Sequence, residues 1–309
     1  MAKSAGIHHI TAIAGEPKRH VAFYARTLGL RFVKRTVNFD DPSTWHLYYG
    51  DETGSPGSAL TFFVWQSLPA GRHGAGEAQE IAFAIPAGSL EYWMKRLAAK
   101  GIAPKTAPPR FGESVIAFED PAGHKLELVA SESAGKIPGW NGEVPAEHAI
   151  RGFHGVTLEL RDTARTADVL TEVFGFRPAG SEQNRQRYVA AEGPLGTVVD
   201  LRVTPGTPRA SEGIGTVHHV AFRAAGDAEE MEMRMRALAL GLRATEQVQR
   251  FYFRSVYFRE PGGVLFEIAT DDPGFAIDEP KERLGSRVML PPWYERKRAA
   301  IEAALPPLE

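Results

Sequence analysis

The sequence predicts an α+β fold in which four βαβββ modules pair into two domains of curved mixed sheets. Three observations predict it. A strand followed by a helix recurs four times, each helix ends at a glycine followed by an apolar residue, and 20 to 22 residues separate a fixed strand position from that glycine. The four glycines are Gly29, Gly101, Gly175 and Gly241. Because a short sheet covered by one helix is only marginally stable, we expect the modules to pair.

Composition limits the classes of function. The chain has 309 residues, enough for two ordinary domains, and its formal net charge is -2. That balance gives no global attraction for nucleic acid or an anionic membrane, and no apolar run reaches the roughly 18 residues of a membrane span. The first residues lack the apolar core of a signal peptide, so we expect a cytoplasmic protein. Without cysteine, any metal must be held by nitrogen and oxygen ligands.

The first two modules are expected near residues 5–70 and 76–132. The first opens with the strand "GIHHITAIAG", continues with a helix begun by Pro17, and ends with the strand "PGSALTFFVW". An insertion, "NFDDPSTWHLYYGDETGS", precedes that last strand. The second has the strand "AQEIAFAIP", a helix with Ser89 as its N-cap, and the closing hairpin "FEDPAGHKLELVA".

The last two modules are expected near residues 151–206 and 215–272. The third runs from "GFHGVTLEL" to "PLGTVVDLRV". The fourth opens with "TVHHVAFRAAG", has Asp227 near the start of its helix, and closes with "FREPGGVLFEIAT".

The predicted domains follow from this order. Their boundaries are 1–135 for modules 1 and 2, 136–150 for a Gly- and Pro-rich linker, 151–275 for modules 3 and 4, and 276–309 for a C-terminal tail. We expect "YERKRAAIEAAL" in that tail to form a short helix packed on the body.

Aligned positions of the modules reveal candidate metal ligands. The first-strand position is taken by His9, Glu80, Gly155 and His219, and the last-strand position by Phe62, Glu127, Asp200 and Glu267. At the first-strand position, histidine occurs only in modules 1 and 4, and only module 4 has both that histidine and a carboxylate at the last-strand position. If these two modules face each other, His9, His219 and Glu267 converge.

Two histidines and one carboxylate form the facial triad of non-haem Fe(II) oxygenases, and these ligands suit Fe(II), with Mn(II) as the alternative. A lone strand histidine is more often a hydrogen-bonded structural residue. Recurrence at equivalent positions beside a carboxylate favours the metal site. Glu80, Glu127 and Asp200 could hold a hard cation, but a decayed duplicate is the preferred interpretation.

The repeat and the triad resemble the vicinal oxygen chelate superfamily, which includes glyoxalase I, bleomycin-resistance proteins and extradiol dioxygenases. Nearly the whole chain resembles its ring-cleaving hydroquinone dioxygenases. The matching stretches are "GIHHITAIAG", "KRTVNFDDPSTWHLYYGD", "SALTFF", "HHVAF", "YFRSVYFREPGGVLFEIATDDPGF" and "LPPWYE". The resemblance implies two glyoxalase-like domains and metal ligands at His9, His219 and Glu267.

The resemblance also implies substrate-contacting or supporting roles for Tyr257, Arg250, His218, His8 and Thr11. Thr11 shares a strand face with His9. Tyr257 could donate to a bound oxygen or be a core or rim aromatic, and Arg250 could stabilise a phenolate or be a solvated strand charge. In a regular strand His8 and His218 point away from their neighbours, unless a bulge or a strand start turns them inward.

The remaining histidines are not assigned as metal ligands. His46 is expected to line the site or to bond to the insertion, and His154 matches His8 in the repeat but is followed by Gly155. Four more, His20, His73, His124 and His148, are interpreted as surface or loop residues.

The leading hypothesis is an Fe(II)-dependent extradiol-type dioxygenase that opens a hydroquinone ring, with a small aromatic substrate and O₂ as its partners. One alternative is a catechol extradiol dioxygenase. Its ligands usually come from modules 3 and 4, which Gly155 argues against. The others are a glyoxalase-type isomerase and a binding module for planar aromatics. Assembly of the chain into a homo-oligomer is a further expectation.

Overall fold

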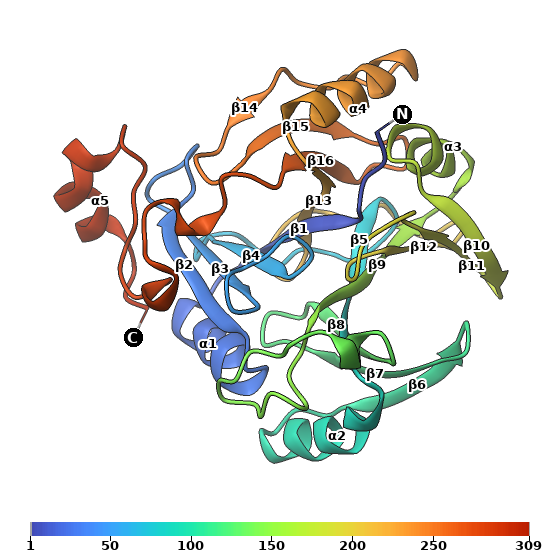
Figure 1. The fold of residues 1–309 in the computed structure, drawn as a ribbon, viewed down its shortest axis with the longest axis horizontal. Coiled ribbons are helices and arrows are strands. Elements are labelled where there is room, and N and C mark those ends of the chain that lie inside the picture. The colour runs from blue at the N-terminus through green and yellow to red at the C-terminus, as the bar shows by residue number, and fades with distance from the viewer. Residues whose placement is uncertain (1, 309) are drawn as a thin grey trace.

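The computed structural model describes residues 2–308, in which sixteen strands form two eight-stranded sheets (Figure 1). Each predicted module is present as a strand, a helix and three further strands. Module 1 consists of β1 (Ile7–Ala14), α1 (Pro17–Val21), β2 (Arg31–Val37), β3 (Trp45–Gly50) and β4 (Ala59–Val64). Module 2 consists of β5 (Glu77–Pro86), α2 (Leu90–Ala99), β6 (Lys105–Arg110), β7 (Glu113–Glu119) and β8 (Lys125–Ser131).

The second half of the chain repeats this order. Module 3 consists of β9 (Gly152–Leu160), α3 (Ala164–Asp168), β10 (Arg177–Glu182), β11 (Arg185–Val189) and β12 (Val198–Val203). Module 4 consists of β13 (Val217–Ala224), α4 (Asp227–Ala239), β14 (Val248–Gln249), β15 (Arg254–Arg259) and β16 (Leu265–Thr270). The helices of modules 1 and 3 continue as π-helical turns over Ala22–Thr27 and Val169–Val173.

The sheets join modules that are distant in sequence. One sheet has the order β14-β15-β16-β13-β1-β4-β3-β2 and unites modules 4 and 1. The other has the order β10-β11-β12-β9-β5-β8-β7-β6 and unites modules 3 and 2. Each sheet therefore takes one module from either side of the segment 136–150. The fold is the predicted α+β arrangement of curved mixed sheets, while the domain boundaries remain a prediction.

The first strands of the paired modules meet at the centre of each sheet. β1 pairs antiparallel with β13, and β5 pairs antiparallel with β9. Within each module the last strand runs parallel to the first, as β4 does beside β1. Each sheet thus has an approximate two-fold relation between its modules.

The helices end as the sequence predicts. Gly29, Gly101, Gly175 and Gly241 all adopt positive φ angles, between 69° and 76°. This left-handed conformation closes a helix and carries a steric penalty for residues with a Cβ atom. Ser89 precedes α2 but does not cap it, because its hydroxyl contacts His148 Nδ1 at 3.1 Å instead.

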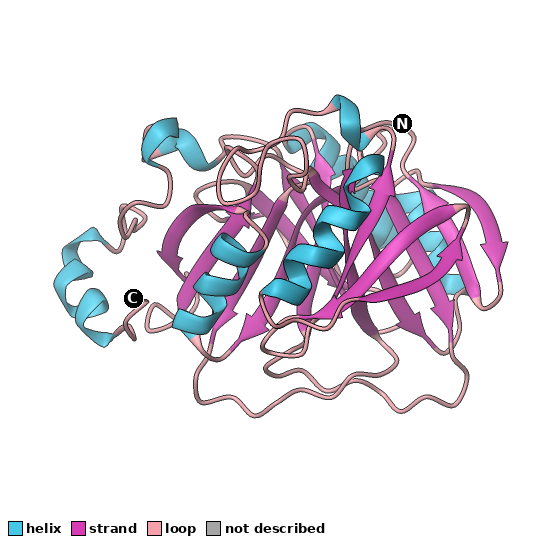
Figure 2. Cartoon of the chain, turned by 90° about the horizontal axis from the view of Figure 1, so that it is seen from below, coloured by secondary structure: helices cyan, strands magenta, loops and turns pink. Residues whose placement is uncertain are grey.

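Alternation along the strands separates an apolar face from a polar one. In β16, Phe266 and Ile268 belong to the apolar core that lies beneath the helices. Glu267 lies between them and points to the opposite face. Ile10 in β1 likewise enters the core, while its neighbours His9 and Thr11 face away from it. Figure 2 shows helices lying against the strands. The face that carries His9, Thr11 and Glu267 also holds a second, smaller apolar cluster that includes Ala221 and Phe253.

The C-terminal tail packs on the body as predicted. Its helix α5 (Arg298–Ala304) buries Ile301 against Val37 and Leu290, and Trp45 Nε1 donates a 2.7 Å hydrogen bond to the Pro306 carbonyl. Within residues 2–308, no helix is both long enough and apolar enough to cross a membrane.

Two of the histidines interpreted as surface or loop residues are buried, although His124 does lie in a loop. His20 lies on the inner face of α1, and His124 follows the turn between β7 and β8. Asp120 joins the two elements, because it accepts a 2.8 Å hydrogen bond from the Tyr24 hydroxyl and lies 2.8 Å from His124 Nδ1. Burial lowers the pKa of His20 to about 3, so this histidine is a neutral structural residue.

Arginine side chains pair with the carboxylates of the duplicate cluster. Arg187 forms two hydrogen bonds of 2.8 and 2.9 Å with Asp200. Arg110 bonds to both oxygens of Glu127, and Arg185 bonds to Glu80 at 2.7 Å. The second sheet therefore places guanidinium groups where a cation would otherwise balance the carboxylates.

Replacement of Arg187 by alanine should destabilise the protein strongly. The change leaves the buried Asp200 without its bidentate partner, which costs about 3 kcal/mol of unfolding free energy. Chemical denaturation measures the loss. Arg254→Ala is the control, since Arg254 pairs with exposed carboxylates and its loss should leave the midpoint nearly unchanged. Equal midpoints for both variants would contradict the structural role of the arginine cluster.

Candidate metal centre and its cavity

Strand register brings the three predicted ligands together. In the antiparallel pair β1–β13, His9 lies opposite Ala221 and Thr11 lies opposite His219. In the parallel pair β13–β16, Ala221 lies opposite Glu267. His9, His219 and Glu267 therefore project from three adjacent strands toward the same face of the sheet.

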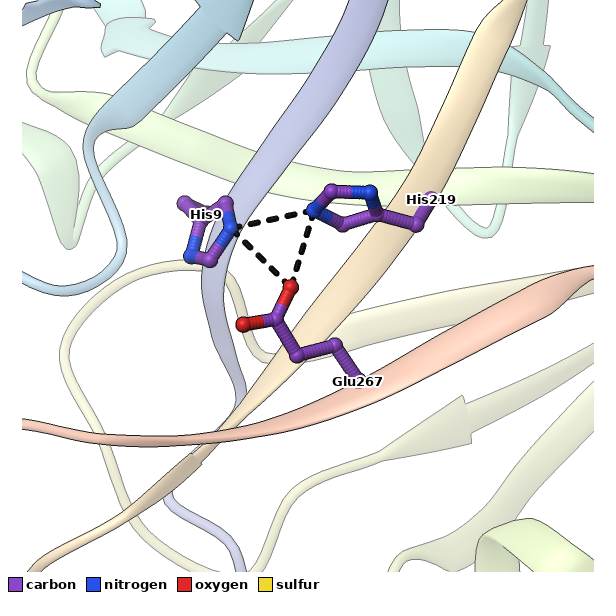
Figure 3. Close-up of side chains that lie close together, drawn as sticks. All are labelled: His9, His219 and Glu267. Atoms are coloured by element: carbon purple, nitrogen blue, oxygen red, sulfur yellow. Dashed lines mark hydrogen bonds and ion pairs between the residues drawn. The ribbon is translucent and has the colours of Figure 1, made fainter. Parts of the chain in front are cut away.

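The ligand atoms converge closely (Figure 3). His9 Nε2 lies 3.2 Å from His219 Nε2 and 3.3 Å from Glu267 Oε2, and His219 Nε2 lies 2.8 Å from that same oxygen. The three residues are 2%, 4% and 0% exposed. Among residues 2–308, this is the only group of three or more His and carboxylate residues whose ligand atoms lie within 4.8 Å of one another.

This geometry fits a divalent cation. Imidazole and carboxylate ligands bind at about 2.1 Å, so adjacent ligands of an octahedral ion lie about 3 Å apart. The three separations are close to that value. Glu267 Oε2 is buried and accepts no well-directed hydrogen bond, whereas Oε1 accepts one from Ser255. A metal ion shared with the two imidazole nitrogens would satisfy this buried carboxylate oxygen.

Electrostatics favour the ligand-competent forms. Burial raises the pKa of Glu267, but the adjacent His9 and His219 outweigh that effect and hold its pKa well below the usual value. Burial lowers the pKa of His219, although Glu267 partly opposes this. A neutral imidazole and an ionised carboxylate are the forms that bind metal.

His8 and His218 turn toward the ligands rather than away from them. The β1–β13 ladder skips His8 between Ile7 and His9, and it skips His218 opposite the step from Thr11 to Ala12. Both residues therefore occupy β-bulges, which re-aim side chains. His8 Nδ1 lies 2.9 Å from His9 Nδ1, and His218 Nδ1 lies 2.7 Å from His219 Nδ1. Such contacts fix the orientation of metal-binding imidazoles.

Tyr257 and Arg250 form one wall of the cavity. Tyr257 is paired across strands with Glu267, and its hydroxyl accepts a 3.0 Å hydrogen bond from Arg250 Nε. Arg250 also donates to Asp40 at 2.9 Å. Burial and the charge of Glu267 raise the pKa of Tyr257 despite the opposing charge of Arg250. The tyrosine therefore remains protonated at neutral pH.

Thr11 belongs to a chain of polar groups on the other side. Its hydroxyl lies 2.8 Å from that of Thr61, Thr61 lies 2.9 Å from His46 Nε2, and His46 Nδ1 lies 2.9 Å from the Tyr48 hydroxyl. Of these residues, the sequence pattern indicated His46 but not Thr61 or Tyr48. The prediction of Phe62 as the counterpart of Glu267 is wrong by one residue.

The register supplies the reason for that error. Thr11 pairs with Thr61 just as Ala221 pairs with Glu267, so Thr61 is the true counterpart. Phe62 points to the apolar core. The alternation in "SALTFF" is the signal that could have distinguished them, since a one-residue shift exchanges the two faces of a strand.

A cavity of about 250 Å³ contains the triad. Its aromatic walls are Phe39, Phe63, Trp65 and Phe253. The volume and the aromatic lining suit one small ring rather than a large ligand. A larger cavity of about 700 Å³ beside α1 is lined by residues of mixed charge and includes none of the triad. The small cavity is therefore the candidate active site.

Family comparison agrees with this fold. The model of the Glyoxalase/Bleomycin resistance protein/Dioxygenase superfamily matches residues 6–128 and 152–268. The chain belongs to this superfamily. The two matched ranges each cover two modules.

Individual relatives indicate which class of enzyme within the superfamily the chain represents. The chain is 46% identical to "Putative ring-cleaving dioxygenase MhqO" of Bacillus subtilis, across 99% of this chain and 97% of that protein. It is 34% identical to "Chlorohydroquinone/hydroquinone 1,2-dioxygenase" of Sphingobium indicum, across 94% and 92%. A crystal structure of a "putative dioxygenase" from B. subtilis has 44% identity and a TM-score of 0.95, covering 100% of this chain and 99% of that one. The chain is accordingly an enzyme of the ring-cleaving dioxygenase class.

Glu267→Gln should abolish stoichiometric metal binding, because it removes the only anionic ligand of the triad. Metal content after anaerobic Fe(II) loading and desalting measures this loss. Glu127→Gln is the matched control, because Glu127 takes the corresponding position in the second sheet and pairs with Arg110. Wild type and Glu127→Gln should each retain one ion per chain. Retention of the ion by Glu267→Gln would contradict the site.

Proposed function

We propose that this chain is an Fe(II)-dependent, extradiol-type ring-cleaving dioxygenase that acts on hydroquinone or substituted hydroquinones. The observation that carries the proposal is the convergence of His9, His219 and Glu267 inside a small aromatic cavity. The relative named for chlorohydroquinone and hydroquinone supports the substrate class. A cytoplasmic location and homo-oligomeric assembly remain predictions.

The triad would hold the metal by one face and leave the remaining positions open. When bound, Fe(II) supplies a Lewis acid and a one-electron donor that can serve a phenolic oxygen and dioxygen together. Mn(II) is compatible with the same ligands. The overall reaction breaks the ring bond between a hydroxyl-bearing carbon and its neighbour, and both atoms of O₂ enter the product.

Tyr257 and Arg250 would manage charge on the substrate. Because Tyr257 stays protonated, its hydroxyl can donate a hydrogen bond to a substrate oxygen. The guanidinium of Arg250 favours a deprotonated phenol, and Asp40 holds it in place. Hydrogen-bond donors aimed at developing negative charge commonly supply a large part of catalysis.

His8 and His218 would act through the ligands beside them. Each lies at hydrogen-bond distance from a ligand imidazole, which fixes the ring so that Nε2 faces the metal position. Phe63, Trp65 and Phe253 would hold the substrate ring and exclude water.

Oxygen uptake tests the proposal directly. Fe(II)-loaded protein should consume about one O₂ per hydroquinone, since both atoms of O₂ enter the product. The aromatic absorbance should disappear, and Glu267→Ala should abolish both signals. Catechol and a methylglyoxal–thiol adduct are run in parallel. Oxygen uptake with catechol alone would mean that the substrates are catechols and not hydroquinones. Isomerisation of the adduct without any oxygen uptake would refute the dioxygenase.

A further inference from the structure

The two halves of the active-site sheet correspond position by position. Tyr257 pairs with Glu267 in module 4, and Tyr48 pairs with Thr61 in module 1. Two residues earlier on the same strands, Ser255 bonds to Glu267 and His46 bonds to Thr61. Tyr48 is therefore the two-fold counterpart of Tyr257, and both tyrosines line the same cavity.

The two halves differ in charge. Module 4 supplies the carboxylate, whereas module 1 has the neutral Thr61 in its place. From Thr61 the hydrogen bonds lead through His46 to Tyr48. Burial, together with the neighbouring ligands His9 and His219, lowers the pKa of His46, so this imidazole is neutral. The module 1 side is a neutral polar wall.

The Tyr48 hydroxyl keeps one unused hydrogen-bonding position. Within residues 2–308 its one hydrogen-bond partner is His46 Nδ1. If Nδ1 accepts from Tyr48, the phenol oxygen still has free lone pairs. If Nδ1 carries the proton and donates, the phenol O–H is free instead. Tyr48 is 2% exposed and borders the cavity, so this remaining capacity is available to a bound ligand.

We propose that Tyr48 binds the second hydroxyl of a 1,4-dihydroxybenzene and selects such rings over phenols and 1,2-diols, with His46 as its positioning residue. The inference rests on the proposed function, because it takes the first hydroxyl to lie at the triad. The hydroxyls of a 1,4-diol point in opposite directions across the ring. Two tyrosines related by an approximate two-fold axis offer partners to both ends of such a ring.

The aromatic walls make this contact selective. Phe39, Phe63 and Phe253 offer no strong hydrogen-bond acceptor to a distal hydroxyl. Asn38 and Asp40 also line the cavity, but Asn38 Oδ1 accepts from the Asp40 backbone N–H, and Asp40 accepts from Arg250. A hydroxyl buried without a partner is unfavourable, so Tyr48 determines whether the second hydroxyl is tolerated. Phenol lacks that group, and catechol carries it beside the first hydroxyl.

Binding without turnover tests the inference. Fe(II)-loaded protein is titrated anaerobically with hydroquinone, phenol and catechol by calorimetry. Wild type should prefer hydroquinone to phenol by about tenfold. In Tyr48→Phe the affinity for hydroquinone should fall about tenfold, while the affinities for phenol and catechol should stay unchanged. His46→Leu should also weaken the binding of hydroquinone selectively, because it removes the hydrogen bond that positions the Tyr48 hydroxyl.

The control is Tyr49→Phe. Tyr49 follows Tyr48 on β3, but it belongs to the apolar core and its hydroxyl contacts His20 at 3.2 Å. This change removes the same atom outside the cavity and should leave all three affinities unchanged. Thermal melts of the variants confirm that they are folded.

The outcomes separate this inference from the proposed reaction. An equal loss for hydroquinone and phenol in Tyr48→Phe would mean that Tyr48 acts by packing, and it would overturn the inference. Unchanged hydroquinone affinity, or a wild type without preference, would overturn it as well. A wild type that prefers hydroquinone but consumes no oxygen would refute ring cleavage and leave the assignment of Tyr48 standing.

Discussion

The antiparallel pairing of β1 with β13 is the constraint on which the active site depends. It joins His9 to His219 across 210 residues of sequence. Two β-bulges in that ladder turn His8 and His218 behind the ligands, and the parallel strand β16 adds Glu267. No ligand pair is local, so the metal centre forms only when modules 1 and 4 share a sheet. The geometry of the candidate site therefore depends on the pairing of these two modules.

Sequence repetition made much of this predictable. Each module repeats the same strand-to-glycine spacing, and Gly29 and its three counterparts close their helices with the expected positive φ. The recurrence of histidine at His9 and His219, with Glu267 in the last strand, was enough to predict the triad. The helix ends and the convergence of these three side chains could be predicted because strand alternation and helix termination are local properties that a repeat displays several times, while metal binding at the triad stays a prediction.

Apart from the misassigned Phe62, what the sequence did not reveal depends on partners that are distant along the chain. His20 and His124 were interpreted as surface or loop residues. Both are buried, because Asp120 in the turn between β7 and β8 bonds to Tyr24, 96 residues away, and this turn packs against the helix of module 1. Bulges at His8 and His218 depend on a ladder that no single strand reveals. The polar chain from Thr11 to Tyr48 likewise appears only once β3, β4 and β1 are placed side by side. Local pattern predicts which face a side chain takes, and tertiary pairing decides what it meets there.

The two sheets show how one architecture can hold different chemistry. The sheet of modules 2 and 3 binds its carboxylates to Arg110, Arg185 and Arg187, whereas the sheet of modules 1 and 4 aims two imidazoles and one carboxylate at a common point. Anomalous diffraction at the iron edge from anaerobically loaded crystals tests this contrast most directly. We expect one peak per chain, within bonding distance of His9, His219 and Glu267. A peak among the arginine-paired carboxylates, or none at the triad, would contradict it.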